Sequence, residues 1–323
     1  MTAVLRAHTA LRQAGLTGAG KLEKAPNSTN EVWFVGSYVM FINPQPETRR
    51  LAHRAEVLKR LPPGIPAPSF VGYGVAKFGE WLVEDRVRGG ELSFTWAELR
   101  EPERERAITA LGLALRELHA VDAVALGLDD APFLHGDTLD CPHQLPVGRL
   151  LDLLARAALL PFVDHEVMRY AVDRVLATAD ALDEAPRTLI HGDLHFENVM
   201  CDGPRLVALI DFEWSRAGSP DLDLDVLLHS LADPALHIRG EKSELHRRDF
   251  ERVTGWLRRA YPELFAHPRL VDRLTLYRLA YDVRALLLQP PDRPAESLSA
   301  HHPYNRILRL LDGRSDLRWV LAG

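Results

Sequence analysis

The sequence has few cysteines, few lysines and no long hydrophobic run. Its two cysteines, Cys141 and Cys201, are too few for a disulfide framework or a four-ligand zinc site. Apolar runs such as residues 285–288 are far too short to cross a bilayer, and residues 1–16 lack the apolar core of a signal peptide. Only five of the 39 basic residues are lysine, so any role that needs a lysine can be checked one residue at a time.

Neither sign of charge dominates the chain. The 39 basic residues face 45 acidic ones, which gives a net charge of −6 and argues against a nucleic-acid coat or a polybasic membrane anchor. Hydrophobic residues make up 46% of the 323 residues, enough for a large core without disulfides. We therefore expect a monomer or homodimer of a reducing compartment, most simply the cytoplasm, with no nucleic-acid or membrane partner.

Secondary-structure signals divide the chain into two unequal parts. Residues 1–87 combine a short helix, a hairpin at residues 31–42 around Gly36-Ser37, a helix at 48–61 and two further strands at 69–75 and 81–87. Residues 88–323 are mostly helical, with predicted helices that include 102–120, 244–261 and 271–288. Short β-like runs at 199–200 and 206–210 interrupt them. The pattern predicts an α+β protein with a small β-rich lobe followed by a large helical one.

The segment with the clearest chemistry lies among these short runs. Residues 191–198 have the sequence His-Gly-Asp-Leu-His-Phe-Glu-Asn, and residues 209–213 have the sequence Leu-Ile-Asp-Phe-Glu. Asp193, Asn198 and Asp211 are thus placed to converge at the mouth of a β-hairpin. Asp and Asn oxygens suit Mg²⁺ that also holds phosphate, and a further Asp can orient and deprotonate a hydroxyl. Together they predict phosphoryl transfer.

This pair of motifs resembles the catalytic and metal loops of the aminoglycoside phosphotransferase and choline kinase family, small-molecule kinases with a two-lobed, protein-kinase-like fold. Residues 218–224 resemble the family's Gly-x-Pro-x-x-Asp-Leu segment, and the order of the lobes agrees from about residue 21 to 288. The resemblance implies ATP or GTP as co-substrate, Mg²⁺ as metal and a small-molecule acceptor.

The resemblance also implies roles for individual residues. Asp193 matches the catalytic aspartate that accepts the acceptor's proton, and Asn198 and Asp211 match the magnesium ligands. Asp223 matches a residue that supports the loops. Nucleotide contacts are expected from the loop over the phosphates and from the hinge at residues 82–86, whose backbone would bind adenine. These positions are Ser28, Thr29, Asn30, Glu84 and Arg86.

One expected feature of the family is missing. The third strand usually carries a lysine or arginine paired with a glutamate of the following helix, but Phe41 and Arg54 stand at these positions. The pair has been replaced as a whole. Arg54 reaches the phosphates from the helix, or the register is shifted and Arg49 or Arg50 serves, or the site no longer uses ATP in the usual way.

Other polar residues have weaker interpretations. Asp221, Asp223 and Asp225, together with acidic residues at 129–140, would attract a cationic acceptor if they faced it. Tyr281-Asp282 on a late helix would face the same cleft. His191 is expected to be structural, and His195 and Glu213 are equally compatible with a surface position. A second His-Gly-Asp at residues 135–137 lacks the asparagine five residues later and is interpreted as a loop.

The leading hypothesis is a small-molecule O-phosphotransferase whose acceptor is a polar, cationic compound such as an antibiotic, a sugar or an amino alcohol. The alternative is a kinase-fold protein that binds a ligand or performs other chemistry, because the usual ion pair is missing. A protein kinase is less favoured, because the segment between Asp211 and Asp223 leaves little room for a polypeptide-binding loop.

Overall fold

An antiparallel sheet forms the N-terminal part of the molecule in the computed structural model, which describes residues 1–25, 31–44, 50–128, 146–183, 187–234, 245–315 and 317. Its neighbouring strands run in the order β1-β2-β3-β5-β4. The strands are β1 (Leu22–Lys24), β2 (Glu31–Val35), β3 (Tyr38–Asn43), β4 (Phe70–Ala76) and β5 (Gly79–Asp85). The predicted hairpin is confirmed, because Val35 pairs with Tyr38 across Gly36-Ser37.

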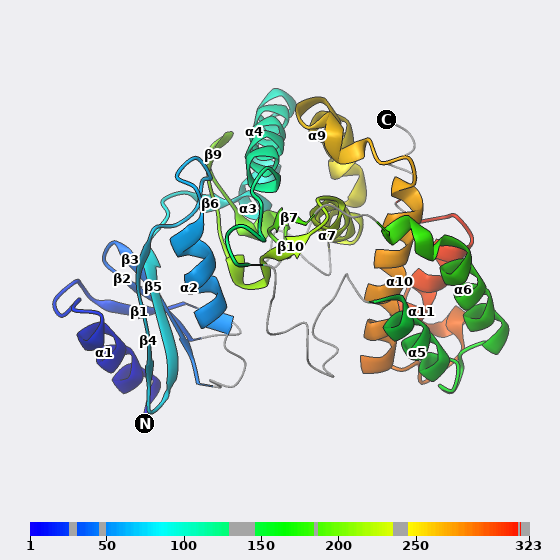
Figure 1. Ribbon diagram of the computed structural model, residues 1–323, viewed down its shortest axis with the longest axis horizontal. Helices are drawn as coiled ribbons and strands as arrows, with labels where there is room; N and C mark the ends of the chain where they lie inside the picture. Colours follow the sequence, from blue (N-terminus) through cyan, green and yellow to red (C-terminus); the bar gives the residue numbers. More distant parts are fainter. Residues whose placement is uncertain are drawn as a thin grey trace.

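Helices cover both faces of this sheet. Side chains alternate along the strands, so Trp33, Met40 and Ile42 pack with α1 (Ala3–Gln13) on one face. On the other face, Leu82 packs with Leu51 and Ala55 of α2 (Arg50–Arg60). Figure 1 shows α1 and α2 on opposite sides of the strands. The face that carries α2 is the one that turns toward the rest of the molecule.

A buried carboxylate fixes the start of α2 to the sheet. Glu80 of β5 accepts the backbone N–H groups of Leu51 at 3.3 Å and Ala52 at 3.0 Å, and the Asn43 side-chain amide at 2.8 Å. The N–H groups in the first turn of a helix have no partner within the helix, so an acceptor there stabilises the helix end. This contact sets where the following turn of α2, with Arg54, meets the sheet.

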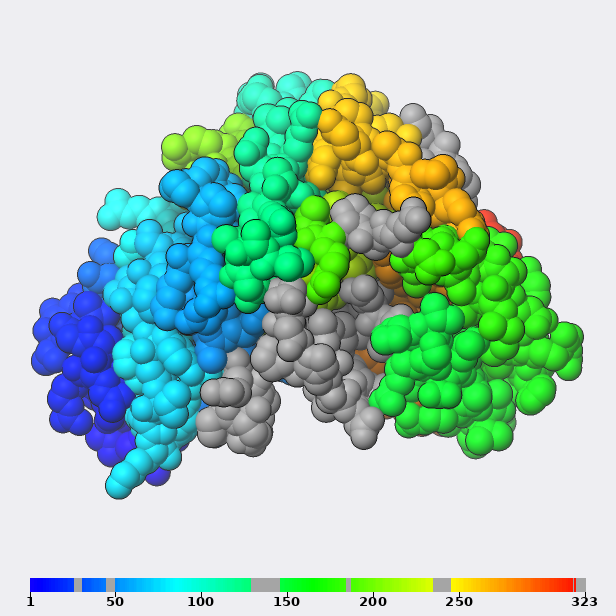
Figure 2. Space-filling model, in the orientation of Figure 1, coloured from blue at the N-terminus to red at the C-terminus, as the bar shows by residue number. Residues whose placement is uncertain are grey.

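The rest of the chain is mainly helical, as predicted. Figure 1 shows α4 and α9 over the middle of the molecule, while α5, α6, α10 and α11 form a bundle at the end opposite the sheet. Figure 2 shows the blue N-terminal part and the green helices at opposite ends of the molecule. The α-helices described in this part of the chain are α3 (Leu92–Thr95), α4 (Glu101–His119), α5 (Val147–Ala157), α6 (His165–Thr178), α7 (Asp221–Ala232), α9 (Val253–Ala260), α10 (Leu270–Leu288) and α11 (Pro303–Leu311).

Two small sheets, whose strands other than β6 lie between α6 and α7 in the sequence, hold the loops that carry the motifs. A three-stranded sheet has the order β6-β8-β9, and a two-stranded sheet pairs β7 with β10. Their strands are β6 (Gly90–Glu91), β7 (Thr188–Ile190), β8 (Val199–Asp202), β9 (Arg205–Leu209) and β10 (Arg216–Gly218). The 191–198 segment follows β7, and Asp211 follows β9. The sequence indicated a short strand before the 191–198 segment but not β10, which is only three residues long.

The predicted helix at 244–261 is only partly correct. Residues 245–252 hold a short 3₁₀ turn, Arg247–Phe250, and α9 begins at Val253. The strand expected at 81–87 runs from Gly79 to Asp85. Of the helices that the structure describes, none is both long and apolar enough to span a membrane.

Candidate active site

The His191-Gly192-Asp193 segment is held by one buried carboxylate. Asp223, near the start of α7, accepts the backbone N–H of His191 at 2.7 Å and of Gly192 at 2.8 Å. Its Oδ2 also lies 3.1 Å from His119 Nε2. Burial alone would raise the pKa of Asp223, but the hydrogen bonds and the neighbouring histidines lower it below its ordinary value. Asp223 therefore supports the loop, as expected from the motif.

Gly192 and His191 tie this loop to the one that carries Asp211. The Gly192 φ angle is +81°, and a Cβ placed there would meet the Trp214 carbonyl oxygen at 2.2 Å, so the position requires glycine. The buried ring of His191 places Nε2 at 2.8 Å from the Ile210 carbonyl oxygen. His191 is thus structural, as predicted, and holds the residue immediately before Asp211.

Asp193 and Asn198 contact one another directly. Asn198 Nδ2 donates to the Asp193 carbonyl at 2.8 Å and to its Oδ2 at 3.3 Å, and the Asp193 side chain remains 33% exposed. His195 Nε2 lies 3.4 Å from the same carboxylate. Burial alone would lower the pKa of His195, but Asp193 and Glu197 raise it above its ordinary value. The sequence left the position of His195 open; the structure places it beside Asp193.

Asp211 lies at the end of the hairpin, as the motif predicted. Val199 pairs with Leu209, and the Ile210 N–H donates to the Asn198 carbonyl at 2.9 Å, which brings the two candidate ligands together. Asp211 adopts left-handed backbone angles, φ 65° and ψ 57°, a conformation that Asp tolerates better than most residues. Its side chain is 41% exposed.

A buried arginine lies beside the third-strand position where the family's cation is missing. Arg54 of α2 donates through Nε and Nη2 to both carboxylate oxygens of Glu84, at 2.5 and 2.7 Å, and through Nη1 to Asp211 Oδ1 at 2.6 Å. Its guanidinium stacks over the Phe41 ring, 4.1 Å from the centroid. The cation therefore comes from the helix and the acid from β5.

The pKa values show how closely this pair is coupled. Burial raises the pKa of the Glu84 carboxyl, and Arg54 opposes that rise. For Arg54, burial alone would lower the pKa, but Glu84 and Asp211 raise it above its ordinary value, so the guanidinium stays charged. Arg50 instead pairs with Glu213 at 3.3 Å, and Arg49 lies outside the described residues.

The hinge residues differ from the expectation in detail. The Glu84 side chain is buried in the Arg54 pair, and the backbone N–H of Arg86 donates to the Ser37 carbonyl at 2.8 Å. The Arg86 guanidinium stacks over Phe34 at 4.4 Å from the ring centroid. Ser28, Thr29 and Asn30, together with the 129–140 acidic residues and the 135–137 loop, lie outside the described residues.

The acidic run of α7 does not face an acceptor, so that argument for a cationic acceptor was wrong. Asp221 forms a buried ion pair with Arg273 of α10, and Asp225 lies 2.5 Å from Arg278 of the same helix. Asp223 is committed to the loop, as shown above. All three side chains are buried, because α7 lies within the helical core.

The residues present fit a magnesium site completed by phosphate oxygens. Asn198 donates through Nδ2, so its amide oxygen is the atom it can offer a cation, and Asp211 bonds Arg54 through Oδ1 alone. Glu213 lies near, since burial and the Asp211 charge raise its pKa. Such crowding of carboxylates favours a divalent cation. In the described residues no group of three His, Cys, Asp or Glu side chains forms a complete metal site.

Comparisons with known proteins identify the family of the chain. The model of the phosphotransferase enzyme family matches residues 24–264, so the chain belongs to that family. A search of curated proteins gives no significant match.

Solved structures share the fold. The streptomycin–ATP complex of APH(2'')-IIa is 15% identical, with a TM-score of 0.61 over 99% of this chain and 98% of that chain. The aminoglycoside phosphotransferase APH(3'')-Id from Streptomyces rimosus ATCC10970 is 21% identical, with a TM-score of 0.55 over 88% and 99%. A mutant of APH(4)-Ia with AMP-PNP and hygromycin B is 15% identical, with a TM-score of 0.60 over 94% and 97%. The expected kinase-like fold is thereby confirmed.

Proposed function

We propose that this protein is a small-molecule O-phosphotransferase that moves the γ-phosphoryl group of ATP or GTP to a hydroxyl group. The observation that carries the proposal is the convergence of Asp193, Asn198, Asp211 and Arg54 on one partly exposed site. The family supports a phosphotransferase, and similar folds are known with ATP and with AMP-PNP bound.

In this mechanism Asp193 orients the acceptor hydroxyl and accepts its proton. The bond from the terminal phosphorus to the nucleoside diphosphate breaks as the new phosphorus–oxygen bond forms, and the electron pair leaves on the diphosphate. Asn198 and Asp211 would hold Mg²⁺, which neutralises phosphate charge when bound. His195 Nε2 lies 3.4 Å from the Asp193 carboxylate, where it helps to orient that carboxylate.

Arg54 takes the part of the missing strand lysine in this proposal. Its planar guanidinium suits phosphate oxygens, and its contact with Asp211 places it next to the proposed metal. Glu84 and the Phe41 ring hold it in place. Each Nη nitrogen carries two N–H groups and donates one of them to a carboxylate, so Arg54 has a further N–H on each Nη to offer a phosphate oxygen.

The decisive test is Asp193→Asn. Nucleoside diphosphate release and the mass of the product would be measured with a panel of hydroxyl compounds, with Asp202→Asn as a matched surface control. We expect turnover to fall by about 10²–10⁴-fold in Asp193→Asn, in line with the loss of a general base, and to persist in the control. Turnover that survives in Asp193→Asn would refute the assignment of the base.

A second candidate is a kinase-fold protein that binds a ligand without transferring phosphate. The feature that favours it is that Arg54 already forms ion pairs with Glu84 and Asp211. Calorimetric titration with ATP and GTP, with and without Mg²⁺, separates the two. Magnesium-dependent binding supports the transferase, whereas no binding of either nucleotide at millimolar concentration supports the second candidate.

A further inference from the structure

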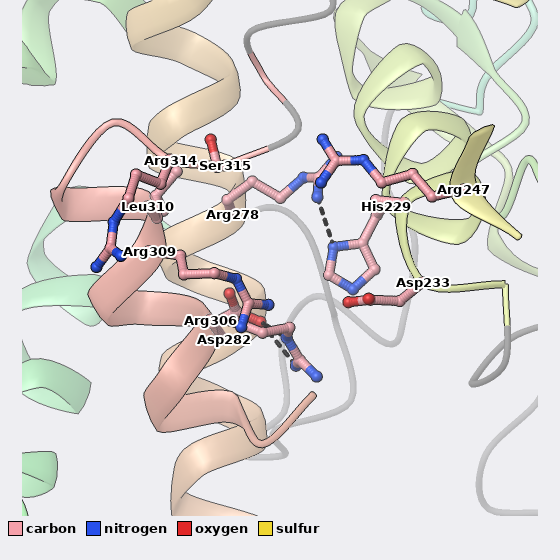
Figure 3. A pocket seen from close by; sticks show the side chains of 11 residues that line it. His229, Asp233, Arg247, Arg278, Asp282, Arg306, Arg309, Leu310, Arg314 and Ser315 are labelled. Carbon is pink, nitrogen blue, oxygen red and sulfur yellow. Dashed lines mark hydrogen bonds and ion pairs between the residues drawn. The ribbon is translucent and has the colours of Figure 1, made fainter. Parts of the chain in front are cut away.

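Buried arginines in the described part of the chain are of two kinds. Three of them form ion pairs with aspartate or glutamate, and these are Arg54, Arg273 and Arg278. Figure 3 shows Arg278 among such contacts, with its Nη1 at 2.9 Å from Nδ1 of His229. The fourth is Arg216, which is 3% exposed and forms no ion pair with any residue that the structure describes.

The hydrogen bonds of Arg216 leave its positive charge without a counter-ion. Arg216 begins β10, where it pairs with Ile190 of β7. Its Nη1 donates to the Trp214 carbonyl at 2.9 Å, and its buried Nε has no partner within the described ranges. A backbone carbonyl is neutral, so this contact does not cancel the charge. A buried charge without an opposite partner destabilises a fold, which makes Arg216 a residue that the fold alone does not explain.

The Arg216 guanidinium lies against the glycine that precedes Asp193. A Cβ built at Gly192 would lie 2.8 Å from Arg216 Nη1 and 2.2 Å from the Trp214 carbonyl oxygen. Arg216 thus holds the carbonyl against which Gly192 packs. Successive Cα atoms are about 3.8 Å apart, so Nη1 lies within about 8 Å of the Asp193 Cα atom.

The same joint reaches the segment that follows Asp211. Ser215 Oγ donates to the His191 carbonyl at 3.0 Å, next to the contact of Gly192 with Trp214. Residues 214–216 are therefore bonded to the loop of Asp193, and they follow Asp211 by only three to five positions in the sequence. Through this joint Arg216 sets the spacing between the proposed base and the proposed metal ligand.

Holding a carbonyl does not require a charged donor. A neutral amide would donate one hydrogen bond to Trp214 without burying a charge. The site itself is rich in negative groups, because Asp193 and Asp211 lie there and the nucleotide phosphates would add to them. In the protein interior a charge is weakly screened and acts over such a distance. A residue kept at a cost in stability beside reacting groups is typical of a functional role.

We propose that Arg216 is a positioning residue for phosphoryl transfer. It holds the loop of Asp193 against residues 214–216, and its unpaired charge favours the phosphate-bearing state of the site. The inference rests on the proposed function for the reaction that it assists. It assigns a part in that reaction to β10, a strand that carries none of the proposed metal ligands.

Three replacements separate the charge from the hydrogen bond. Arg216→Lys keeps the charge, Arg216→Gln keeps a donor without the charge, and Arg216→Met keeps neither. Arg205→Gln is the matched control, because Arg205 lies on β9 with a side chain 74% exposed. The full chain would be used throughout. Urea unfolding gives the stability, initial rates with a panel of hydroxyl compounds give kcat and KM, and calorimetry gives the affinity for ATP with Mg²⁺.

We expect stability and activity to change in opposite directions. Arg216→Gln removes an unpaired buried charge, so it should unfold at the same urea concentration as wild type or a higher one. Its kcat should fall by about tenfold, the effect of one charge at this range in a protein, with KM for the acceptor unchanged. Arg216→Lys should retain kcat, Arg216→Met should lose at least as much as Arg216→Gln, and Arg205→Gln should match wild type.

A structural role would give the reverse pattern. In that case Arg216→Gln would be clearly less stable than wild type while its kcat stayed the same. Either of these two results, or an equal loss of kcat in Arg216→Lys and Arg216→Gln, would overturn the inference.

The two proposals fail in different ways. If Arg216→Gln transfers phosphate as fast as wild type, the phosphotransferase stands and the role of Arg216 is refuted. If wild type phosphorylates no acceptor, the proposed function fails and calorimetry decides. Binding of ATP with Mg²⁺ that weakens in Arg216→Gln but not in Arg216→Lys would uphold the role of the charge at the site. Equal binding in all variants, or no binding in wild type, would refute it.

Discussion

Two arginine-containing regions of the molecule differ in how their charge is held. Beside Asp211, Arg54 is 3% exposed and all three of its guanidinium nitrogens donate to carboxylates. At the far end of α7, five arginines line a pocket, where Arg278, Arg306 and Arg314 pair with Asp225, Asp282 and Asp312 and Arg309 donates to a backbone carbonyl. The first region holds one arginine in a buried network, whereas the second spreads its arginines over several separate ion pairs.

The largest expected effect follows from breaking the Arg54 pair. Replacing Arg54 by Met leaves Glu84 buried without its cation, and removal of one partner from a buried pair destabilises by about 3–5 kcal/mol. Urea unfolding would measure this loss. Arg50→Met on the same helix is the control, because the partly exposed Arg50–Glu213 pair contributes no more than about 1 kcal/mol.

The double variant Arg54→Met/Glu84→Leu separates stability from function. It removes both buried charges, so we expect it to recover most of the lost stability while nucleotide binding stays weak.

Low pH should also recover part of the stability that the single variant Arg54→Met loses. Burial raises the pKa of Glu84, and without Arg54 the folded state binds a proton more strongly than the unfolded state. Stability of Arg54→Met should then be greatest below the ordinary pKa of Glu, about 4.3, and decrease as pH rises above it. A single variant as stable as wild type at every pH would contradict this account.

A smaller effect on stability is expected at Asp223 of α7, which holds the His191-Gly192 backbone. Asp223→Asn places an amide N–H group against the N–H donors of His191 and Gly192. We expect a loss of about 2–3 kcal/mol at neutral pH, with turnover reduced because the loop loosens. Urea unfolding and product release would measure both, with exposed Asp173→Asn as control.

The stability difference between wild type and Asp223→Asn should depend on pH in a defined direction. The pKa of Asp223 is lower in the folded protein than its ordinary value, so its contribution is complete above that value, about 3.9 for Asp, and declines as pH falls below it. The gap between wild type and Asp223→Asn should therefore narrow in acid. A gap that widens in acid would show that the carboxylate is not the stabilising form.

The sequence predicted the catalytic loop well because its chemistry is local. Asp193 and Asn198 lie five residues apart and contact one another. Asp211 follows β9, which forms a hairpin with β8, the strand that begins directly after Asn198. The lobes and the hairpin at Gly36 were likewise visible in short-range patterns. The boundary placed at residue 87 remains a prediction.

The sequence did not predict ion pairs between distant segments. The motif directed attention to Phe41, whereas the acid that holds Arg54 is Glu84, 30 positions away on another strand. Two signals were present: Arg54 lies between Leu51 and Leu58 on the buried side of α2, and Glu84 ends an apolar strand. For the same reason Asp221 and Asp225 were taken as exposed, although Arg273 and Arg278 on apolar α10 are their partners.

The smallest expected effect is on the stability of Arg309→Gln. Arg309 contributes a hydrogen bond to the Ala300 carbonyl and no ion pair among the described residues, so its replacement should change the free energy of unfolding by no more than about 0.5 kcal/mol. Urea unfolding beside Arg248→Gln would measure this. A loss comparable to that of Arg54→Met would mean that Arg309, like Arg54, stabilises the fold.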